Sequence, residues 1–198
     1  MSSLLPLVPF YFLRHGITDH NRNRLVMGQL DIPLNMAGRR QARQAAELAA
    51  SLGIVRIVSS PLTRARETAA IIASFLGLPV IVENGFKERD WGTMEGRSYR
   101  ELIDLDRVPE GAESFEDFSS RAIAVLPSAL LPAPALLVAH SGLCRVLRHY
   151  LSISDNLHSV PNAVPIRFSP DSSGRWSECE VTLAALRQAK AKGEPDLR

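Results

Sequence analysis

The sequence FYFLRHGITDHN, residues 10–21, decides the fold and marks the edge where chemistry is expected. Its first four residues are apolar and aromatic, as is typical of a short strand buried on both faces, so we predict a strand over residues 8–13. Arg14, His15 and Gly16 follow this strand directly. In an open α/β sheet, polar residues just past a strand lie at the edge where ligands bind.

Strand and helix patterns alternate along the rest of the chain. Short apolar and β-branched runs predict strands at 54–58, 79–82 and 135–139, and a hairpin formed by 164–168 and 175–181. Helical periodicity predicts helices at 36–52, 61–75, 98–106, 114–126 and 143–151 and in the C-terminal segment. We expect Asn35 to cap the first of these helices, and Ser60 to cap the second with Pro61 as its first residue.

This alternation predicts an α/β fold, a three-layer α/β/α sandwich with a mostly parallel central sheet and a C-terminal hairpin. The 198 residues contain no long polar linker, so we expect a single domain over residues 1–198. Its core should span about residues 8–181, and residues 86–114 should form a small cap or insert. Apolar residues make up 45% of the chain, which is enough for a large core.

Charge and cysteine content narrow the classes of function. The chain has 23 basic and 21 acidic residues without a basic block, so we expect no nucleic-acid partner. No apolar run approaches the roughly 20 residues that span a bilayer, and Pro6 and Pro9 interrupt the apolar N-terminal run, so we expect neither a membrane segment nor a signal peptide. Cys144 and Cys179 have no metal-binding spacing, and a cytoplasmic location is expected. A monomer and a homodimer remain equally open.

Four groups, Arg14 with His15, Arg64, Glu88 and His140, carry chemistry that is mutually consistent. His15 and His140 each follow a predicted strand, Arg14 precedes the first histidine, Arg64 lies in the helix after the second strand, and Glu88 lies in an irregular loop. Arginine forks suit a phosphate, and a histidine nitrogen can be a nucleophile at neutral pH. Glu88 could supply the proton that a leaving alkoxide needs. The predicted substrate group is therefore phosphoryl.

Further polar groups could complete such a site. Gly16 permits unusual backbone angles and close approach of an anion, while Thr18 and Asn21 offer neutral donors. Backbone amides at the start of the helix near Ser141 could bind the anion as well.

Each of these residues could instead have an ordinary structural role. A histidine after a strand is often structural, and Arg64 or Glu88 could be a plain surface charge. A zinc site around His15, His20 and His140 is disfavoured because two arginines would oppose a dication, so no metal ligand is assigned. The chain has neither a serine-hydrolase elbow nor a Walker loop.

The ordered set of motifs, from about residue 10 to residue 181, resembles the histidine phosphatase superfamily, also called phosphoglycerate mutase-like. The matching segments are Arg14-His15-Gly16 with Thr18 and Asn21, residues 28–34, residues 59–65 around Arg64, Glu88 with Gly92 and residues 95–96, residues 138–142 around His140, and residues 161–163.

The resemblance implies a mechanism. His15 would attack the phosphoryl group to give a phosphohistidine that water hydrolyses, and Glu88 would protonate the leaving oxygen. Arg14, Arg64 and His140 would hold the phosphoryl oxygens, with Thr18, Asn21 and backbone near Gly28 and Ser141 completing the pocket. The resemblance implies no metal and no cofactor.

Within the family, the resemblance favours a phosphatase acting on a small phosphorylated metabolite. Residues 101–113 are short and acidic where phosphoglycerate mutases carry a longer basic insertion, and Gly111-Ala112-Glu113-Ser114 is similar to the Gly-Gly-Glu-Ser stretch of α-ribazole and broad-specificity phosphatases. Ala112 and His20 depart from the usual pattern and bear on substrate choice. A mutase-type isomerase and a phosphate-binding module without turnover are the alternatives.

Overall fold

The computed structural model describes residues 5–101, 108–154 and 160–182. Its centre is a six-stranded sheet with the strand order β3-β2-β4-β1-β5-β6. The first four strands in this order run parallel: β3 (Val80–Val82), β2 (Arg56–Ser59), β4 (Ala135–Ala139) and β1 (Phe10–Arg14). β5 (Pro165–Pro170) is antiparallel to β1 and forms a hairpin with β6 (Trp176–Glu180). The predicted sheet and hairpin are confirmed.

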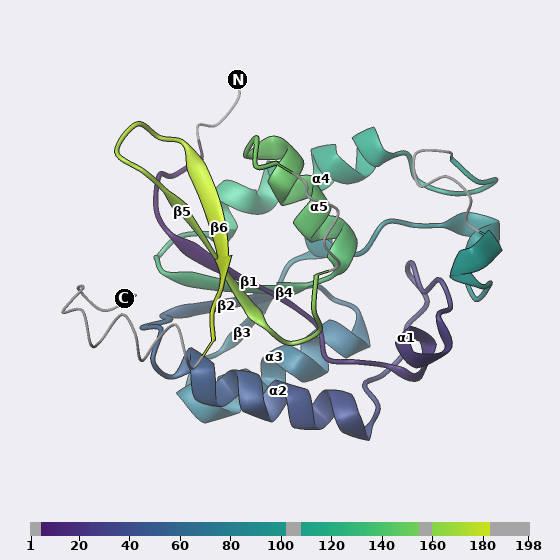
Figure 1. Cartoon of the computed structure of the whole chain (residues 1–198), viewed down its shortest axis with the longest axis horizontal. Helices are drawn as coiled ribbons and strands as arrows, with labels where there is room; N and C mark the ends of the chain where they lie inside the picture. Colours follow the sequence, from purple (N-terminus) through teal and green to yellow (C-terminus); the bar gives the residue numbers. More distant parts are fainter. Residues whose placement is uncertain (1–4, 102–107, 155–159, 183–198) are drawn as a thin grey trace.

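Helices cover both faces of this sheet (Figure 1). Helices α2 (Met36–Ala49) and α3 (Thr63–Leu76) lie on one face, and α4 (Phe115–Ala129) and α5 (Ser141–Tyr150) lie on the other. Phe10 and Phe12 pack into the core on the α4/α5 side, whereas the intervening Tyr11 and Leu13 pack on the α2/α3 side. This period-two alternation explains why a strand buried on both faces is continuously apolar, and it confirms the three-layer sandwich.

The connections that follow β1 and β4 lead to opposite sides of this strand pair. From β1 the chain crosses through α2 to β2, on the far side of β4, whereas from β4 it crosses through α5 to β5, on the far side of β1. Such a switch point leaves room for ligands beyond the carboxyl ends of the strands. Arg14 pairs with Ala139 at the end of the parallel ladder, so the next residues, His15 and His140, emerge side by side.

The predicted start of α3 is wrong. The helix begins at Thr63, and its N-cap residue, Leu62, makes no side-chain capping bond. Ser60 instead extends the sheet, because its N–H donates to Val138 O over 3.0 Å. The capping acceptor is the distant Asp31 carboxylate, which accepts from the N–H of Thr63 at 2.6 Å and from its hydroxyl at 2.7 Å. A carboxylate at this position accepts from a backbone N–H that has no partner within the helix, and its negative charge interacts favourably with the positive end of the helix dipole.

The remaining element boundaries differ by a few residues. Asn35 caps α2 as predicted, by accepting from Gly38 N, but the helix ends at Ala49, and α5 begins at Ser141, two residues early. A short helix that was not predicted, α1 (Asp19–Asn23), follows the first strand. Of the helix predicted at 98–106 only a 3₁₀ turn, Tyr99–Glu101, is described, and residues 102–107 lie outside the described part, as does the predicted C-terminal helix.

Within the described residues, the longest helices are too short and too polar to cross a membrane.

Candidate active site

The two histidines that follow strands lie next to each other at the carboxyl edge of the sheet. The N–H of His15 donates to Ala139 O at 2.9 Å, and the rings of His15 and His140 have centroids 5.3 Å apart. Both side chains are buried, with 2% and 1% of their surface exposed. Asn162 holds the His15 backbone by donating to its carbonyl over 2.7 Å. The pairing of β1 with β4 therefore brings together two histidines that are 125 positions apart in the chain, at 15 and 140.

The protonation state of His15 follows from its contacts. Its Nδ1 lies 2.8 Å from Gly16 O, and since a carbonyl oxygen only accepts, Nδ1 carries the proton. Burial, together with the positive charges of Arg64 and Arg14, lowers the pKa of His15 well below its usual value, which keeps the ring neutral. Nε2 thus retains its lone pair, as a nucleophile requires.

The reason for Gly16 differs from the prediction. The φ angle of Gly16 is not in the left-handed region. Instead, the first turn of α2 lies close to Gly16, and a Cβ on Gly16 would lie 2.5 Å from Gly38 O. A Cβ on Gly38 would in turn collide with the carbonyl of Ile17. Thr68 also fixes the loop, by accepting from Gly16 N at 3.0 Å. The glycine allows the backbone after His15 to pack directly on a helix.

Two arginines lie beside His15. Arg64 is fully buried, and its terminal nitrogens donate to Leu30 O and Gly28 O, both at 2.7 Å. Arg14 is partly buried and donates to Val160 O at 2.8 Å. Burial lowers the pKa of both guanidinium groups even though nearby Glu88 opposes the shift. An anion bound beside these two cations would offset the cost of burying them.

Three of the predicted phosphoryl ligands have a buried nitrogen without a hydrogen-bond partner among the described residues. These atoms are Arg14 Nε, Arg64 Nε and His140 Nδ1. Buried polar atoms are nearly always satisfied, so these three nitrogens are available to the oxygens of a bound ligand.

Ser60 holds the ring of His140 through a hydrogen bond. The Ser60 hydroxyl lies 2.7 Å from His140 Nε2 and already accepts from Leu62 N at 3.3 Å. Donation of the hydroxyl hydrogen to His140 Nε2 would place the ring proton on Nδ1. Burial and the charge of Arg64 lower the pKa of His140 well below its usual value. The unpartnered Nδ1 is then an N–H donor.

Glu88 lines the same cavity. One carboxylate oxygen accepts from Arg89 N at 2.9 Å, and the other accepts from Gly142 N, in the first turn of α5, at 3.0 Å. Only 8% of the residue is exposed. The acid is thus attached to the helix that begins directly after His140.

Arg121 of α4 holds the loop that carries Glu88. Its five N–H donors all have partners: the Gly85, Lys87 and Glu88 carbonyls at 2.9–3.0 Å, and both carboxylate oxygens of Glu113 at 2.6 and 2.8 Å. Glu113 in turn accepts from Asp90 N at 3.3 Å. The backbone before and after the acid is therefore fixed by one ion pair.

The remaining predicted residues fall into two groups. Gly28 and Ser141 line the cavity with Arg14, His15, Arg64 and Glu88. Thr18 and Asn21 are not among the lining residues; they form the capping box of α1, in which each side chain accepts from the backbone of the other. The structure therefore uses these two side chains to shape the loop.

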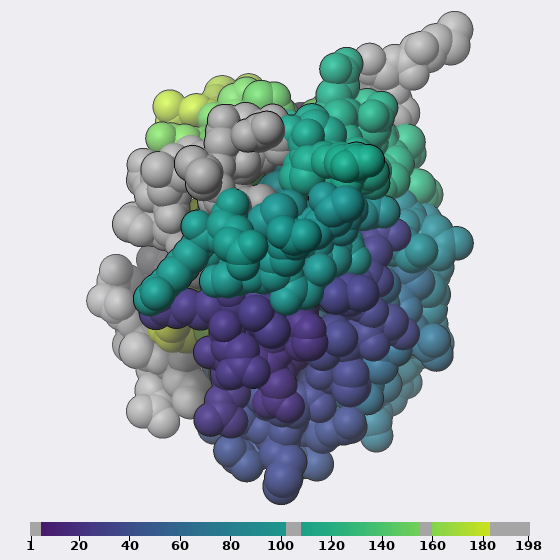
Figure 2. Space-filling view, turned by 90° about the vertical axis from the view of Figure 1, so that its right-hand side faces the viewer, coloured from purple at the N-terminus to yellow at the C-terminus, as the bar shows by residue number. Residues whose placement is uncertain are grey.

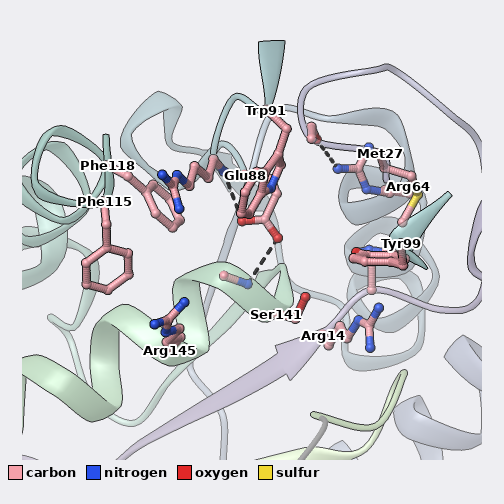
Figure 3. Close-up of a pocket in the computed structure, with 14 residues that line it drawn as sticks. Arg14, Met27, Arg64, Glu88, Trp91, Tyr99, Phe115, Phe118, Ser141 and Arg145 are labelled. Atoms are coloured by element: carbon pink, nitrogen blue, oxygen red, sulfur yellow. Dashed lines mark hydrogen bonds between the residues drawn. The ribbon is translucent and has the colours of Figure 1, made fainter. Parts of the chain in front are cut away.

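The cavity has a volume of about 200 Å³ (Figure 3). Its lining includes residues that sequence reasoning missed: Met27, Arg89, Trp91, Tyr99, Phe115, Phe118, Gly142 and Arg145. Burial, and then the negative charge of Glu88, raise the pKa of Tyr99, so its hydroxyl remains a donor. The irregular loop with Trp91 was a usable signal, whereas nothing local marked Tyr99 or the face of α4.

Part of the predicted cap covers this edge of the sheet. The segment after α1 pairs with residues 96–99, through Val26 N to Arg97 O at 2.8 Å and Tyr99 N to Arg24 O at 2.9 Å. Figure 2 shows the two segments, purple and teal, side by side on this face. Their pairing brings Tyr99 to the cavity. No cluster of three or more metal-ligating side chains occurs among the described residues.

Comparisons with known proteins agree with this geometry. Residues 10–163 match the model of the histidine phosphatase superfamily, branch 1. A probable phosphoglycerate mutase of Klebsiella pneumoniae is 40% identical over 151 residues, which cover 68% of this chain and 70% of the relative. An uncharacterized phosphatase of Bacillus subtilis is 36% identical over 148 residues, covering 72% and 77%.

Solved structures are similar over most of the chain. A mycobacterial glucosyl-3-phosphoglycerate phosphatase in complex with VO3 superposes with a TM-score of 0.76 at 30% identity, covering 87% of this chain and 98% of that one. The family model spans more than half of the chain, and within its range Arg14, His15, Arg64 and Glu88 line one cavity. The chain therefore belongs to the histidine phosphatase superfamily.

Proposed function

We propose that the protein is a phosphomonoesterase that uses His15 as nucleophile and Glu88 as proton donor, without a metal ion. The observation that carries the proposal is the neutral His15 with its Nε2 lone pair, beside buried nitrogens of Arg14, Arg64 and His140 that have no partner among the described residues. A nucleophile next to fixed, unsatisfied donors suits a transition state in which charge builds on phosphoryl oxygens.

The reaction divides into two transfers. First, His15 Nε2 forms a bond to phosphorus while the ester P–O bond breaks, and the Glu88 carboxyl gives its proton to the leaving oxygen. Next, the Glu88 carboxylate takes a proton from water, the water oxygen attacks phosphorus and the P–N bond breaks. Inorganic phosphate and neutral His15 result, and Glu88 is again protonated.

The first experiment measures release of 4-nitrophenol from 4-nitrophenyl phosphate in buffer with EDTA. We expect saturable turnover that EDTA does not change. Arg64→Ala should lower kcat/KM about 100-fold, since one lost charge-stabilising donor commonly costs that much. Arg66→Ala is the matched control, because Arg66 lies on the same helix and is exposed. Absence of turnover, or full activity of Arg64→Ala, would contradict the proposal.

A mutase is the second candidate, because a relative at 40% identity bears that name. It predicts that 3-phosphoglycerate is isomerised, with activity dependent on a bisphosphate primer. The phosphatase predicts release of inorganic phosphate without a primer. A phosphate-binding module without turnover predicts saturable phosphate binding by calorimetry and neither reaction. A screen of phosphorylated metabolites, phosphoglycerate esters included, would identify the substrate.

A further inference from the structure

Tyr99 is a residue of the cavity lining that the proposed mechanism does not use. It begins the 3₁₀ turn of the cap, and its N–H donates to Arg24 O at 2.9 Å. The preceding residue, Ser98, pairs with Leu25 in an antiparallel bridge. The segment that follows Leu25 also lines the cavity, at Met27 and Gly28. Pairing with this segment therefore fixes where the ring of Tyr99 lies.

The hydroxyl of Tyr99 lies near the groups proposed to act on the phosphoryl group. In Figure 3 the ring lies between Arg64 and Arg14, with its hydroxyl oxygen on the side of Glu88. Burial and the negative charge of Glu88 raise the pKa of Tyr99. The positive charges of Arg14 and Arg64 oppose this shift, which agrees with the placement in the figure. The hydroxyl thus lies beside one acid and two phosphate-binding cations.

This hydroxyl is available to a ligand. Within the part of the chain that the structure describes, no hydrogen bond engages it. A phenol with a raised pKa keeps its proton at neutral pH and has one O–H to donate. A donor of this kind in a site for a phosphoryl group suits a phosphoryl oxygen, because the charge that builds in the transition state is spread over those oxygens.

We propose that Tyr99 is a further catalytic residue, whose hydroxyl donates a hydrogen bond to a phosphoryl oxygen of the bound ester. The inference rests on the proposed function, because His15 as nucleophile determines where the phosphoryl group lies. The other proposed donors come from the ends of β1 and β4 and from α3, whereas Tyr99 comes from the cap. Two separate parts of the chain therefore hold the transition state, and the cap takes part in the chemistry.

The kinetic test uses Tyr99→Phe, which removes only the hydroxyl. We expect kcat/KM to fall about tenfold or more, and by the same factor for 4-nitrophenyl phosphate and phenyl phosphate, because the lost donor serves the phosphoryl group. The inhibition constant of vanadate, which imitates the transition state, should rise by a similar factor. Tyr150→Phe is the matched control: Tyr150 is 41% exposed against 43% for Tyr99, and it lies outside the cavity lining, so both constants should stay at the wild-type values.

A measurement on the wild-type protein tests the contact without a variant at Tyr99. The chain has three tyrosines, Tyr11, Tyr99 and Tyr150, so labelling with ¹³Cζ-tyrosine gives three signals. Tyr11→Phe and Tyr150→Phe identify two of these signals and leave the third for Tyr99. Inorganic phosphate should shift the Tyr99 signal and raise its pKa further, because the bound anion is negative and accepts from the hydroxyl. The signals of the other two tyrosines should not move.

Three results would overturn the inference while the wild-type enzyme remains active. They are unchanged kinetics in Tyr99→Phe, a loss confined to phenyl phosphate, which would place the hydroxyl on the leaving oxygen, and a Tyr99 signal that saturating phosphate does not move. Failure of the proposed function is a different result, because the wild-type enzyme would then hydrolyse neither ester.

Discussion

The N–H of Gly142 donates to the carboxylate of Glu88 over 3.0 Å, so the first turn of the helix after His140 holds the proposed acid. A Cβ on Gly142 would collide with one carboxylate oxygen and lie 2.9 Å from Glu88 Cδ. Gly142→Ala should therefore displace the acid, although alanine favours the helix by about 1 kcal/mol. We expect kcat for phenyl phosphate to fall about 100-fold.

The same variant should lose much less activity with 4-nitrophenyl phosphate, whose leaving oxygen needs little protonation. Steady-state kinetics with the two esters measures this difference. An equal loss with both would place the defect elsewhere than in proton donation.

Ser60 orients His140 through the 2.7 Å contact between the hydroxyl and Nε2. Without the Ser60 hydroxyl, the His140 ring should no longer be held in one tautomer and orientation. Ser60→Ala should therefore lower kcat/KM by about tenfold to 100-fold, because the His140 Nδ1–H is no longer held in place to donate to the phosphoryl group. Ser59→Ala removes a neighbouring buried hydroxyl, one that donates to Ser60 O, and serves as the control. Ring ¹⁵N NMR should show the Nδ1–H form of His140 in wild type and a mixture in Ser60→Ala. An unchanged tautomer would refute the positioning role.

Arg121 positions the acid loop with its five donors. Lysine keeps the charge and has only three donors, so Arg121→Lys should lower kcat for phenyl phosphate by about tenfold or more. Arg148→Lys is a matched control, since Arg148 is also buried and ion-paired, with Glu178 at 2.7 Å, but lies outside the cavity lining. Arg148→Lys should lower the free energy of unfolding and leave kcat for phenyl phosphate unchanged. Equal kinetic losses in both variants would mean that Arg121 is merely structural.

Two buried neutral histidines should make stability depend on pH. Burial and neighbouring positive charges lower the pKa of His15 and His140 well below 6.5, whereas the unfolded chain titrates near its ordinary value. Below about pH 6.5 the unfolded chain therefore binds more protons, and stability present above that pH is lost as the pH falls. The loss reaches about 1.4 kcal/mol per pH unit for each histidine.

Urea unfolding between pH 7.5 and 5 measures this dependence. The His15→Asn/His140→Asn variant should have a shallower pH dependence than wild type, and the difference cancels the contribution of the carboxylates. Identical slopes would show that neither histidine is held neutral.

Local patterns predicted the sheet well. The run at residues 10–13 is continuously apolar because it is buried between two helical layers, and this requirement is visible in the residues themselves. The start of α3 could not be predicted, because its capping carboxylate, Asp31, comes from 32 positions earlier in the chain. Ser60 and Pro61 match the sequence pattern of a helix start, yet the Ser60 side chain instead forms a hydrogen bond with His140, 80 positions later in the chain.

The site was predictable where its residues follow strands. His15, Arg14 and His140 stand at strand ends, and a parallel sheet gathers such ends. The part of the cavity lined by Phe115, Phe118 and Arg145 was not predictable, because these residues look like ordinary helix residues until α4 and α5 pack together. Thr18 and Asn21 are the opposite case. Their position in the sequence predicted a role in the site, but in the structure they cap α1.

Trapping the phosphorylated enzyme tests the proposed role of His15 most directly. With ³²P-labelled 4-nitrophenyl phosphate and rapid acid-free quenching, Glu88→Gln should accumulate close to one label per chain, because this leaving group needs little protonation and hydrolysis needs the carboxylate. The label should be acid-labile, map to His15, persist in Glu88→Gln/His20→Ala and vanish in Glu88→Gln/His15→Ala. Turnover at the wild-type rate in His15→Ala, or label on another residue, would contradict nucleophilic catalysis by His15.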